Sequence, residues 1–512
     1  MRKPLLYHRG LRPLALLCAM VLLVAPLRAT WSIVIVDRLT GEVCVATATC
    51  IPNANIQQHV PVIVVGRGAA AAQSFIDNTG ANRQFIRDAF VAGLSPDEIL
   101  TSLSQTDSSH QTRQYGIVSL YDGVPVSFTG TGAGHARLGV TGQDGSRAYA
   151  IQGNVLAGAE VILAAEAALL AADGDLSQRV MAAMEAARTM GGDGRCSCHP
   201  VNADSCGAPP PDFTHSAYCA CIVVARMGDG DGTCSYAAGC ANGTYFLSRR
   251  VTGGANQTDP VIRLQRKVDW WREGRRGLAD HLQSQVHAKA ARLVADGITG
   301  TDVTIRLVDI DGLPLDHGGQ TITVVDTGTG AATAGTVTDH GDGTHTFPVT
   351  ATTAAGTSVF EISVTENSET ALLWPPLTMA VDLPAPIHVG WEVVSSAAEM
   401  EVPFVLHPSG FTTNHTYRVL ASAAGTVPGT PFGSDTIPLN EDRWLHWTLP
   451  GTDSPLFPGS SGYLDGSGRA EAFLHLQPGT LGNWIGGRVD FCGWFPGLDE
   501  VFSHPVGFTV AP

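Results

Sequence analysis

The pair Ala29-Thr30 is the place where the sequence offers a reactive group. Thr30 begins a β-branched, apolar run that extends to Val36, and it follows a stretch with the features of a secretory leader. Cleavage after Ala29 would leave Thr30 as the first residue, with a hydroxyl and a free α-amine on the same residue. The amine can accept the hydroxyl proton, so one residue would supply both a nucleophile and its general base. The alternative is that Thr30 is merely the residue that follows a signal peptide.

Residues 1–29 have the parts of a signal peptide. Basic residues precede a short apolar run over residues 14–25, which is too short to span a bilayer. The cleavage site ends at Ala29, whereas a cut after Ala25 would place Pro26 directly after the scissile bond. We therefore predict a signal peptide over residues 1–29 and a secreted, periplasmic or cell-surface protein.

The charge of the exported chain argues against several classes of partner. Five basic residues and no acidic ones lie in the leader, so the mature chain keeps 26 Lys and Arg against 47 Asp and Glu, a net charge of −21. This excess of negative charge opposes general binding to nucleic acid or to anionic membranes. No later run is long and apolar enough for a transmembrane helix. We expect no nucleic-acid partner and no membrane span.

Ten cysteines remain after the leader, and in an oxidising compartment they predict disulfides, although the spacing does not determine the pairing. Cys492 lies far from the others and is either free or paired at long range. The nine remaining disulfide candidates are Cys44, Cys50, Cys196, Cys198, Cys206, Cys219, Cys221, Cys234 and Cys240. The alternative for part of this set is a zinc site of Cys196, Cys198, His199 and Cys206, whose spacing lacks the usual C-x₂-C pair.

The order of the predicted elements over residues 30–260 indicates a layered α+β domain. Hairpin-linked strands favour antiparallel sheets, and two separate helix pairs can cover two outer faces, so a four-layer αββα sandwich fits the pattern. Strands are predicted at 31–36, 43–49, 61–66, 114–121, 124–129, 147–152, 218–226 and 245–250, and helices at 82–92, 96–104, 159–172 and 176–190.

Three further segments follow the first domain. Residues 261–298 carry apolar side chains at three- and four-residue steps, which predicts a long amphipathic helix or linker. Residues 301–383 hold short alternating runs separated by Gly- and Asp-rich turns, a pattern typical of an immunoglobulin-like β-sandwich. Residues 384–512 form a second β-rich module. The long helix or the β-modules would provide cell-surface attachment or self-association.

Several motifs of the first domain follow one another in the order found in a known family. They are Thr30-Trp31-Ser32-Ile33-Val34, Gly41-Glu42-Val43, Arg113-Gln114-Tyr115-Gly116-Ile117-Val118, Gln152-Gly153-Asn154-Val155-Leu156-Ala157-Gly158 and Gly191-Gly192-Asp193. Through them, residues 30–270 resemble the domain of unknown function 1028 family, which is grouped with the N-terminal nucleophile (Ntn) hydrolases. The resemblance implies an αββα fold, hydrolysis of a small or peptide-like amide by Thr30, and no cofactor.

An Ntn hydrolase needs hydrogen-bond donors for the oxyanion that forms when the hydroxyl attacks an amide carbonyl. Gly153 and Asn154 lie where a strand ends before a helix, and we predict that they are these catalytic donors. Gln152 beside them is a predicted substrate-binding residue. The alternative for Asn154 is that it closes a turn or caps the helix.

Asp193 and Arg195 are the other two predicted substrate-binding residues, and a structural ion pair between them is the alternative. We predict no metal site. The second hypothesis for the whole chain is a non-catalytic exported protein with a binding or structural role on the same scaffold, because a fold alone does not imply an activity.

Overall fold

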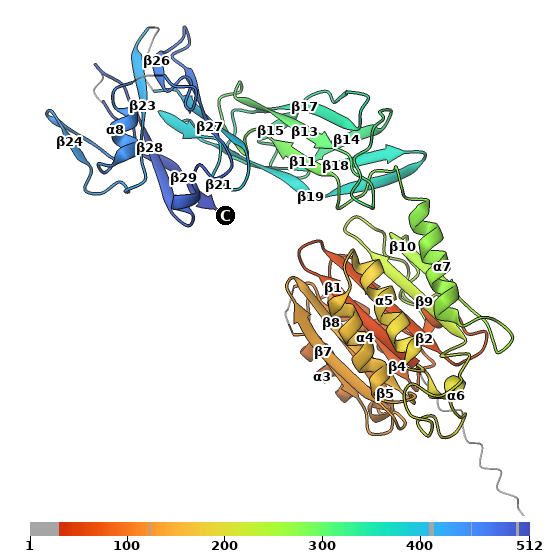
Figure 1. Cartoon of the computed structure of the whole chain (residues 1–512). Coiled ribbons are helices and arrows are strands. Elements are labelled where there is room, and N and C mark those ends of the chain that lie inside the picture. Colours follow the sequence, from red (N-terminus) through yellow and green to blue (C-terminus); the bar gives the residue numbers. More distant parts are fainter. Residues whose placement is uncertain (1–29, 122–123, 409–413, 452, 498–500) are drawn as a thin grey trace, which may run out of the picture. The chain divides into compact units, whose positions relative to one another are not determined.

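The computed structural model describes residues 30–121, 124–408, 414–451, 453–497 and 501–512 (Figure 1). The predicted signal peptide, residues 1–29, lies outside the described residues. The chain divides into two compact units, Met1–Lys267 and Val268–Pro512. None of the helices in the described part of the chain combines the length and the apolar character that a membrane crossing needs.

The first unit contains two antiparallel sheets that pack face to face. The larger sheet has the order β10-β9-β2-β1-β8-β7, and the smaller has the order β3-β4-β5-β6. The strands of the larger sheet are β1 (Thr30–Asp37), β2 (Glu42–Thr49), β7 (Leu138–Asp144), β8 (Arg147–Asn154), β9 (Cys219–Ala225) and β10 (Leu247–Val251). Those of the smaller sheet are β3 (Pro61–Val64), β4 (Gly68–Ser74), β5 (Arg113–Ser119) and β6 (Val126–Thr129).

Two helix pairs cover the outer faces of these sheets. Helices α2 (Ala81–Val91) and α3 (Pro96–Thr106) pack on the smaller sheet, and α4 (Glu160–Ala171) and α5 (Leu176–Thr189) pack on the larger one (Figure 1). The layers therefore follow the order helix, sheet, sheet, helix. The unit also contains the short helices α1 (Ile56–His59), η1 (His110–Thr112) and α6 (Gly194–Ser197).

The sequence explains why these elements form. Helix α3 begins at the expected capping box, in which Ser95 and Glu98 bond reciprocally, with proline at the first helical turn. In β1 the alternation places Val34 and Val36 in the apolar core between the sheets. Strands β4 and β7 were absent from the prediction because one is a run of alanines and the other contains two glycines, and neither composition favours a strand.

The long helix predicted for residues 261–298 is wrong for most of its length. Helix α7 spans only Pro260–Glu273, and β11 (Gln285–Ala288) and β12 (Arg292–Val294) occupy the second half of that segment. The helix ends before Gly274, and Gly277 adopts φ +72°, a left-handed conformation that a helix interior does not contain. Of the apolar residues after this break, Val286 and Leu293 belong to strands of the next module.

The second unit contains two β-modules with separate cores. In the first module, the sheets β11-β13-β17-β15 and β12-β19-β18-β14 enclose one core, and β16 pairs with β17. This region corresponds to the predicted immunoglobulin-like module, although β11 and β12 precede residue 301. Its further strands are β13 (Gly300–Arg306), β14 (Thr321–Asp326), β15 (Ala332–Ala334), β16 (Thr338–Asp339), β17 (Thr344–Ala351), β18 (Gly356–Glu366) and β19 (Glu369–Asp382).

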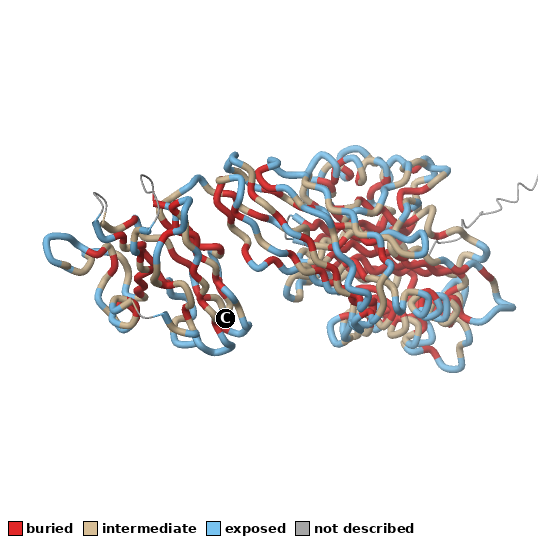
Figure 2. Tube along the Cα trace, turned by 90° about the horizontal axis from the view of Figure 1, so that it is seen from above, coloured by how far each residue is buried: buried red, intermediate tan, exposed pale blue. Residues whose placement is uncertain are grey.

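The second module has an aromatic core that contains Phe404, Phe457, Phe491 and Phe508. Buried residues concentrate in its strands, and the tube in Figure 2 shows buried stretches alternating with exposed ones. Its sheets are β20-β22-β27, β21-β29-β28-β23-β26 and β24-β25. Its elements are β20 (Ile387–Val389), β21 (Val393–Ser395), β22 (Met400–Leu406), β23 (Thr416–Ser422), β24 (Thr430–Phe432), β25 (Asp435–Ile437), α8 (Arg443–Thr448), β26 (Ser461–Tyr463), β27 (Ala470–Leu476), η2 (Gly482–Trp484), β28 (Arg488–Trp494) and β29 (Val506–Ala511).

Candidate functional site

Thr30 is the first residue of β1, an interior strand of the larger sheet between β2 and β8. It pairs with Asn154 at the end of β8, and it is buried, with 1% of its surface exposed. Thr30 shares its alternation with Ser32 and Val34, whose side chains face the smaller sheet. The side chain of Thr30 therefore points into the space between the two sheets.

The interior between the sheets changes from apolar to polar at the end where Thr30 lies. Toward the other end it is filled by valine, isoleucine and alanine. We call the neutral polar residues near Thr30 the polar layer: Thr30, Ser32, Thr47, Gln73, Ser74, Gln114, Gln152 and Asn154, each at most 1% exposed. Burying so many polar side chains costs free energy unless they are hydrogen-bonded, so a purely structural core would not favour this composition.

Glutamines from the smaller sheet connect the polar layer to β1 and β8. Gln73 Nε2 donates to the carbonyl oxygen of Thr30 at 2.9 Å and to Gln114 Oε1 at 2.8 Å. Ser32 Oγ donates to Gln73 Oε1. Gln114 Nε2 in turn donates to the carbonyl oxygen of Gly153 at 2.9 Å. These bonds hold the first residue of β1 and the end of β8 against the second sheet.

The three residues predicted beside Thr30 do lie at the end of β8. Asn154 Nδ2 donates to the carbonyl oxygen of Ala133 at 2.9 Å and to Ser74 Oγ at 3.3 Å, so its amide hydrogens are directed at protein acceptors. Gly153 has a packing role, because a Cβ there would lie 2.7 Å from Leu156 Cδ2. The side chain of Gln152 lies over Gly116 of the opposite sheet.

Replacement of Gly116 by alanine is expected to destabilise the first unit. The added Cβ would lie 2.2 Å from Gln152 Oε1, so the Gln152 side chain or the facing strands must move. Overpacking of this kind costs about 1–3 kcal/mol of unfolding free energy, measurable by urea denaturation. Gly254→Ala is the matched control, because the nearest atom to its added Cβ is 3.9 Å away. Equal stability of the two variants would contradict the close packing of Gln152 on Gly116.

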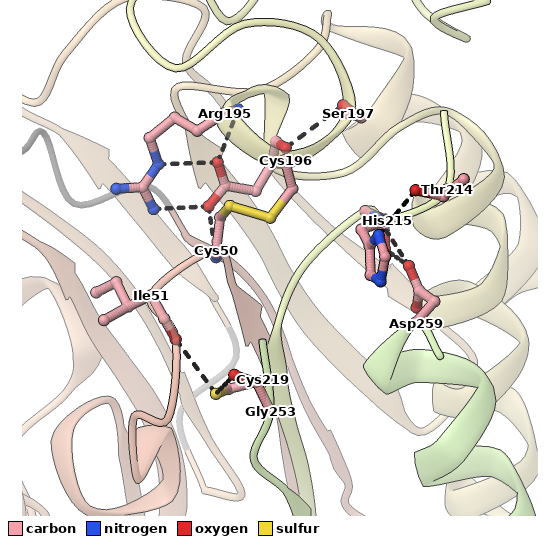
Figure 3. Close-up of a disulfide and its surroundings, with 12 residues drawn as sticks. Cys50, Ile51, Arg195, Cys196, Ser197, Thr214, His215, Cys219, Gly253 and Asp259 are labelled. Atoms are coloured by element: carbon pink, nitrogen blue, oxygen red, sulfur yellow. Dashed lines mark hydrogen bonds and ion pairs between the residues drawn. A yellow bond between two sulfur atoms is a disulfide. The ribbon is translucent and has the colours of Figure 1, made fainter. Parts of the chain in front are cut away.

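Asp193 and Arg195 are brought together as an ion pair. Figure 3 shows Arg195 beside the disulfide of Cys50 and Cys196, just beyond the end of β2. Asp193 accepts hydrogen bonds from Arg195 Nη2 at 2.7 Å, Arg195 Nε at 3.0 Å and the backbone nitrogen of Cys50 at 2.7 Å. The carboxylate is fully buried, whereas 12% of the Arg195 side chain is exposed. A disulfide between Cys50 and Cys196 joins the same segments.

The structure pairs six of the nine disulfide candidates, as Cys50–Cys196, Cys198–Cys206 and Cys234–Cys240. Cys44, Cys219 and Cys221 are free thiols, which corrects the expectation that they form disulfides; Cys492 is also free. Cys219 and Cys221 belong to the core between the sheets, whereas the alternation of β2 turns Cys44 toward the helices. Burial raises the pKa of the Cys44 and Cys221 thiols, which keeps them protonated.

The zinc site considered for residues 196–206 does not match the structure. The sulfur atoms of Cys196, Cys198 and Cys206 are all in disulfides, so none is a thiolate that could bind zinc. Across the described ranges, no group of three or more His, Cys, Asp or Glu side chains is arranged to hold a metal ion.

The pattern of residues alone did not reveal Gln73, Ser74 and Gln114. The first two end β4, which was not predicted as a strand, and a glutamine in a strand carries no signal of its own. The available signal is the alternation Ala69, Ala71, Gln73, which continues an interior face with a polar residue.

Part of the first unit matches a known family by sequence. Residues 30–199 match the profile of a family of unknown function (DUF1028). Among solved structures, protein SPO2555 from Silicibacter pomeroyi, which belongs to the same family, is 18% identical and has a TM-score of 0.35. That match covers 47% of this chain and 85% of the other.

The first β-module matches a different family. Residues 280–372 match the profile of invasin domain 3. The adhesin InvE of Yersinia pseudotuberculosis is 18% identical over 44% of this chain and 58% of its own, with a TM-score of 0.18. Invasin, a bacterial integrin-binding protein, is 14% identical over 57% of this chain and 46% of its own, with a TM-score of 0.18. None of the curated proteins matches this chain.

Proposed function

We propose that the chain is an exported Ntn-type amidohydrolase in which removal of residues 1–29 frees Thr30 as the nucleophile. The observation that carries the proposal is the polar layer, because its buried, neutral polar side chains gather at this one residue. The layer order helix, sheet, sheet, helix and the match of residues 30–199 to DUF1028 support it.

In the proposed reaction, Thr30 Oγ attacks the carbonyl carbon of an amide while its own α-amine takes the hydroxyl proton. The amine then gives that proton to the leaving nitrogen, and water hydrolyses the resulting ester. A free α-amine has a pKa of about 7.7–8.0 in water. The buried, uncharged surroundings of Thr30 would lower this pKa, since burial disfavours the ammonium form, and would increase the fraction of neutral base.

Asn154 and Gly153 are the proposed source of oxyanion stabilisation. In the described part of the structure, the bond from Asn154 Nδ2 to Ser74 Oγ, at 3.3 Å, is longer than its bond to the carbonyl oxygen of Ala133. We propose that this hydrogen turns to the oxyanion when substrate binds, while the 2.9 Å bond to Ala133 holds the amide in place. Gln152, Asp193 and Arg195 are the proposed substrate-side residues, and Arg195 is the one of the ion pair with exposed surface.

The remaining segments are proposed accessories. The domain plan is a leader over residues 1–29, a catalytic domain over 30–260, a connecting segment that begins at residue 261, a first β-module that includes β11 and β12 and extends to residue 383, and a second over 384–512. The three disulfides fit an oxidising compartment outside the cytoplasm. A secreted, periplasmic or surface location, with a small or peptide-like amide as substrate, is consistent with them.

A second function is favoured by the match of residues 280–372 to invasin domain 3. Under it, the exported protein has a binding or structural role at the cell surface, and the first unit is a scaffold without activity. The two functions differ at Thr30, because only the enzyme requires a free amine on that residue.

The proposed enzyme requires a defined N-terminus, which N-terminal sequencing and intact-mass measurement of the exported protein would establish. We expect the mature chain to begin at Thr30 with an unmodified amine. Export of an Ala29→Trp variant, which blocks the small-residue cleavage site, should yield uncleaved precursor without activity. A mature chain that begins at any other residue, or whose amine is blocked, would contradict the enzyme and leave the binding role.

A further inference from the structure

Gln73 reaches Thr30 from the opposite sheet. It lies on β4, and its side chain crosses to the larger sheet, where Nε2 donates to the carbonyl oxygen of Thr30 at 2.9 Å. The same nitrogen lies 2.8 Å from Gln114 Oε1 and 3.4 Å from the carbonyl oxygen of Gln152, and Oε1 accepts from Ser32 Oγ. One amide therefore connects β4 with β1, β5 and β8.

The position of Gln73 in its strand makes a polar residue costly there. Ala69 and Ala71, on the same face of β4, are part of the apolar core between the sheets. Gln73 is 1% exposed, so it has lost nearly all contact with water. An apolar core at this level, with Gln73 and its side-chain partners all replaced, would need no such bonds, and replacing both partners of a buried hydrogen bond is often neutral or stabilising. Packing alone therefore does not account for glutamine at this position.

The next residue, Ser74, holds the partner of Thr30 in the larger sheet. Ser74 has φ +73°, a left-handed conformation that is uncommon and costs free energy for a residue other than glycine. Its hydroxyl donates to the carbonyl oxygen of Ala133 at 3.2 Å and accepts from Asn154 Nδ2 at 3.3 Å. The end of β4 therefore contacts both residues of the Thr30–Asn154 pair.

We infer that Gln73 is a positioning residue for Thr30, an inference that rests on the proposed function. Removal of the leader leaves Thr30 attached to the chain only through its carbonyl group, so the peptide bond that fixed its nitrogen is gone. A hydrogen bond to the carbonyl oxygen fixes the plane of the following peptide group. Only rotation about the Cα–C and Cα–Cβ bonds of Thr30 then remains, so the bond restricts the positions that the amine and the hydroxyl can take relative to a bound substrate.

The positioning role of Gln73 can be tested without a substrate, by following the titration of the Thr30 amine. The mature protein is labelled with ¹³C at threonine methyl groups, and the Thr30 signal is identified by its loss in Thr30→Ser. We expect it to titrate with a midpoint below about 7.7–8.0 in the unaltered protein. Gln73→Glu places a carboxylate where the Gln73 amide contacts the Thr30 carbonyl oxygen. The Thr30 amine belongs to the same residue as that oxygen, so the carboxylate lies within about 6 Å of the amine. An opposite charge at this distance raises the midpoint of the amine titration by about one pH unit or more.

Gln73→Met removes the donor and keeps the length of the side chain. We expect its midpoint to move toward the value in water and its Thr30 methyl signal to broaden, since the terminal residue is no longer fixed. Gln57→Leu is the matched control. Gln57 also connects two segments through its amide, with bonds from Nε2 to the carbonyl oxygen of Ala241 at 2.8 Å and to Ser248 Oγ at 2.9 Å, and its removal should leave the titration unchanged.

The outcomes separate the two claims. A Thr30 signal that titrates equally in the unaltered protein and in both Gln73 variants overturns the positioning role and leaves the proposed function intact. A Thr30 signal that does not titrate in the unaltered protein overturns the proposed function, and the positioning role with it. If Gln73→Glu does not fold, Gln73→Met alone decides, because an unchanged midpoint in that variant contradicts the inference.

Discussion

Thr30→Ala in the exported protein is expected to lose amide hydrolysis while the protein remains folded. The substitution removes Oγ, the atom that forms the ester with the substrate, and leaves the α-amine without a hydroxyl to activate. Loss of a nucleophile in comparable hydrolases lowers kcat by about 10⁴-fold or more. The free energy of unfolding should change by about 1 kcal/mol or less, because the change removes one small side chain at the end of a strand.

The measurement is turnover of a panel of acyl p-nitroanilides and short peptide amides, with thermal unfolding recorded for each variant. Thr30→Ser keeps both a hydroxyl and an amine and should retain measurable turnover. Ser119→Ala is the matched control, because Ser119 is another buried hydroxyl, 5% exposed, at the far end of the same pair of sheets. Turnover by Thr30→Ala equal to that of the unaltered protein would remove Thr30 from the chemistry.

The elements of the first unit that the sequence predicted correctly share a strong local signal. Helix α3 has a capping box and a proline at its start, and α5 ends at the glycine pair after Met190. The helix predicted after Pro260 failed because apolar spacing continued past Gly277, where the backbone turns. Val286 and Leu293, which continue the apolar spacing, lie in strands of the first β-module, and the spacing alone cannot distinguish such strands from a continued helix.

The residues of the candidate site also differ in whether a local sequence signal predicts them. Thr30, Gly153 and Asn154 lie in recognisable motifs, and the structure brings the ends of β1 and β8 together. Gln73 and Ser74 contribute through contacts across two sheets, and no local pattern reports such contacts. The disulfide pattern could not be predicted from local sequence either. Cys50 forms a disulfide with a residue 146 positions away, and three other candidates are free thiols.

Of the three disulfides, Cys50–Cys196 is expected to contribute most to the stability of the first unit. A cross-link stabilises mainly by restricting the unfolded chain, and the effect grows with the length of the loop that it closes. The sequence separation is 146 for Cys50–Cys196 and 8 for Cys198–Cys206. Loop-closure entropy then gives about 5 kcal/mol for the first and about 2.6 kcal/mol for the second.

The comparison is between the double variants Cys50→Ser/Cys196→Ser and Cys198→Ser/Cys206→Ser. Hydrogen exchange of peptides from β1 and β2 reports the unfolding free energy of the first unit separately from that of the β-modules. We expect the long-range variant to lose about twice as much free energy as the short-range one, and the short-range pair is its control. Because Cys50 N also donates to Asp193 at 2.7 Å, the loss should extend to the Asp193–Arg195 ion pair and to the end of β2 beside Thr30. Equal losses in the two variants would mean that the unfolded chain already holds these segments together, and that local contacts determine the stability of this end of the sheet.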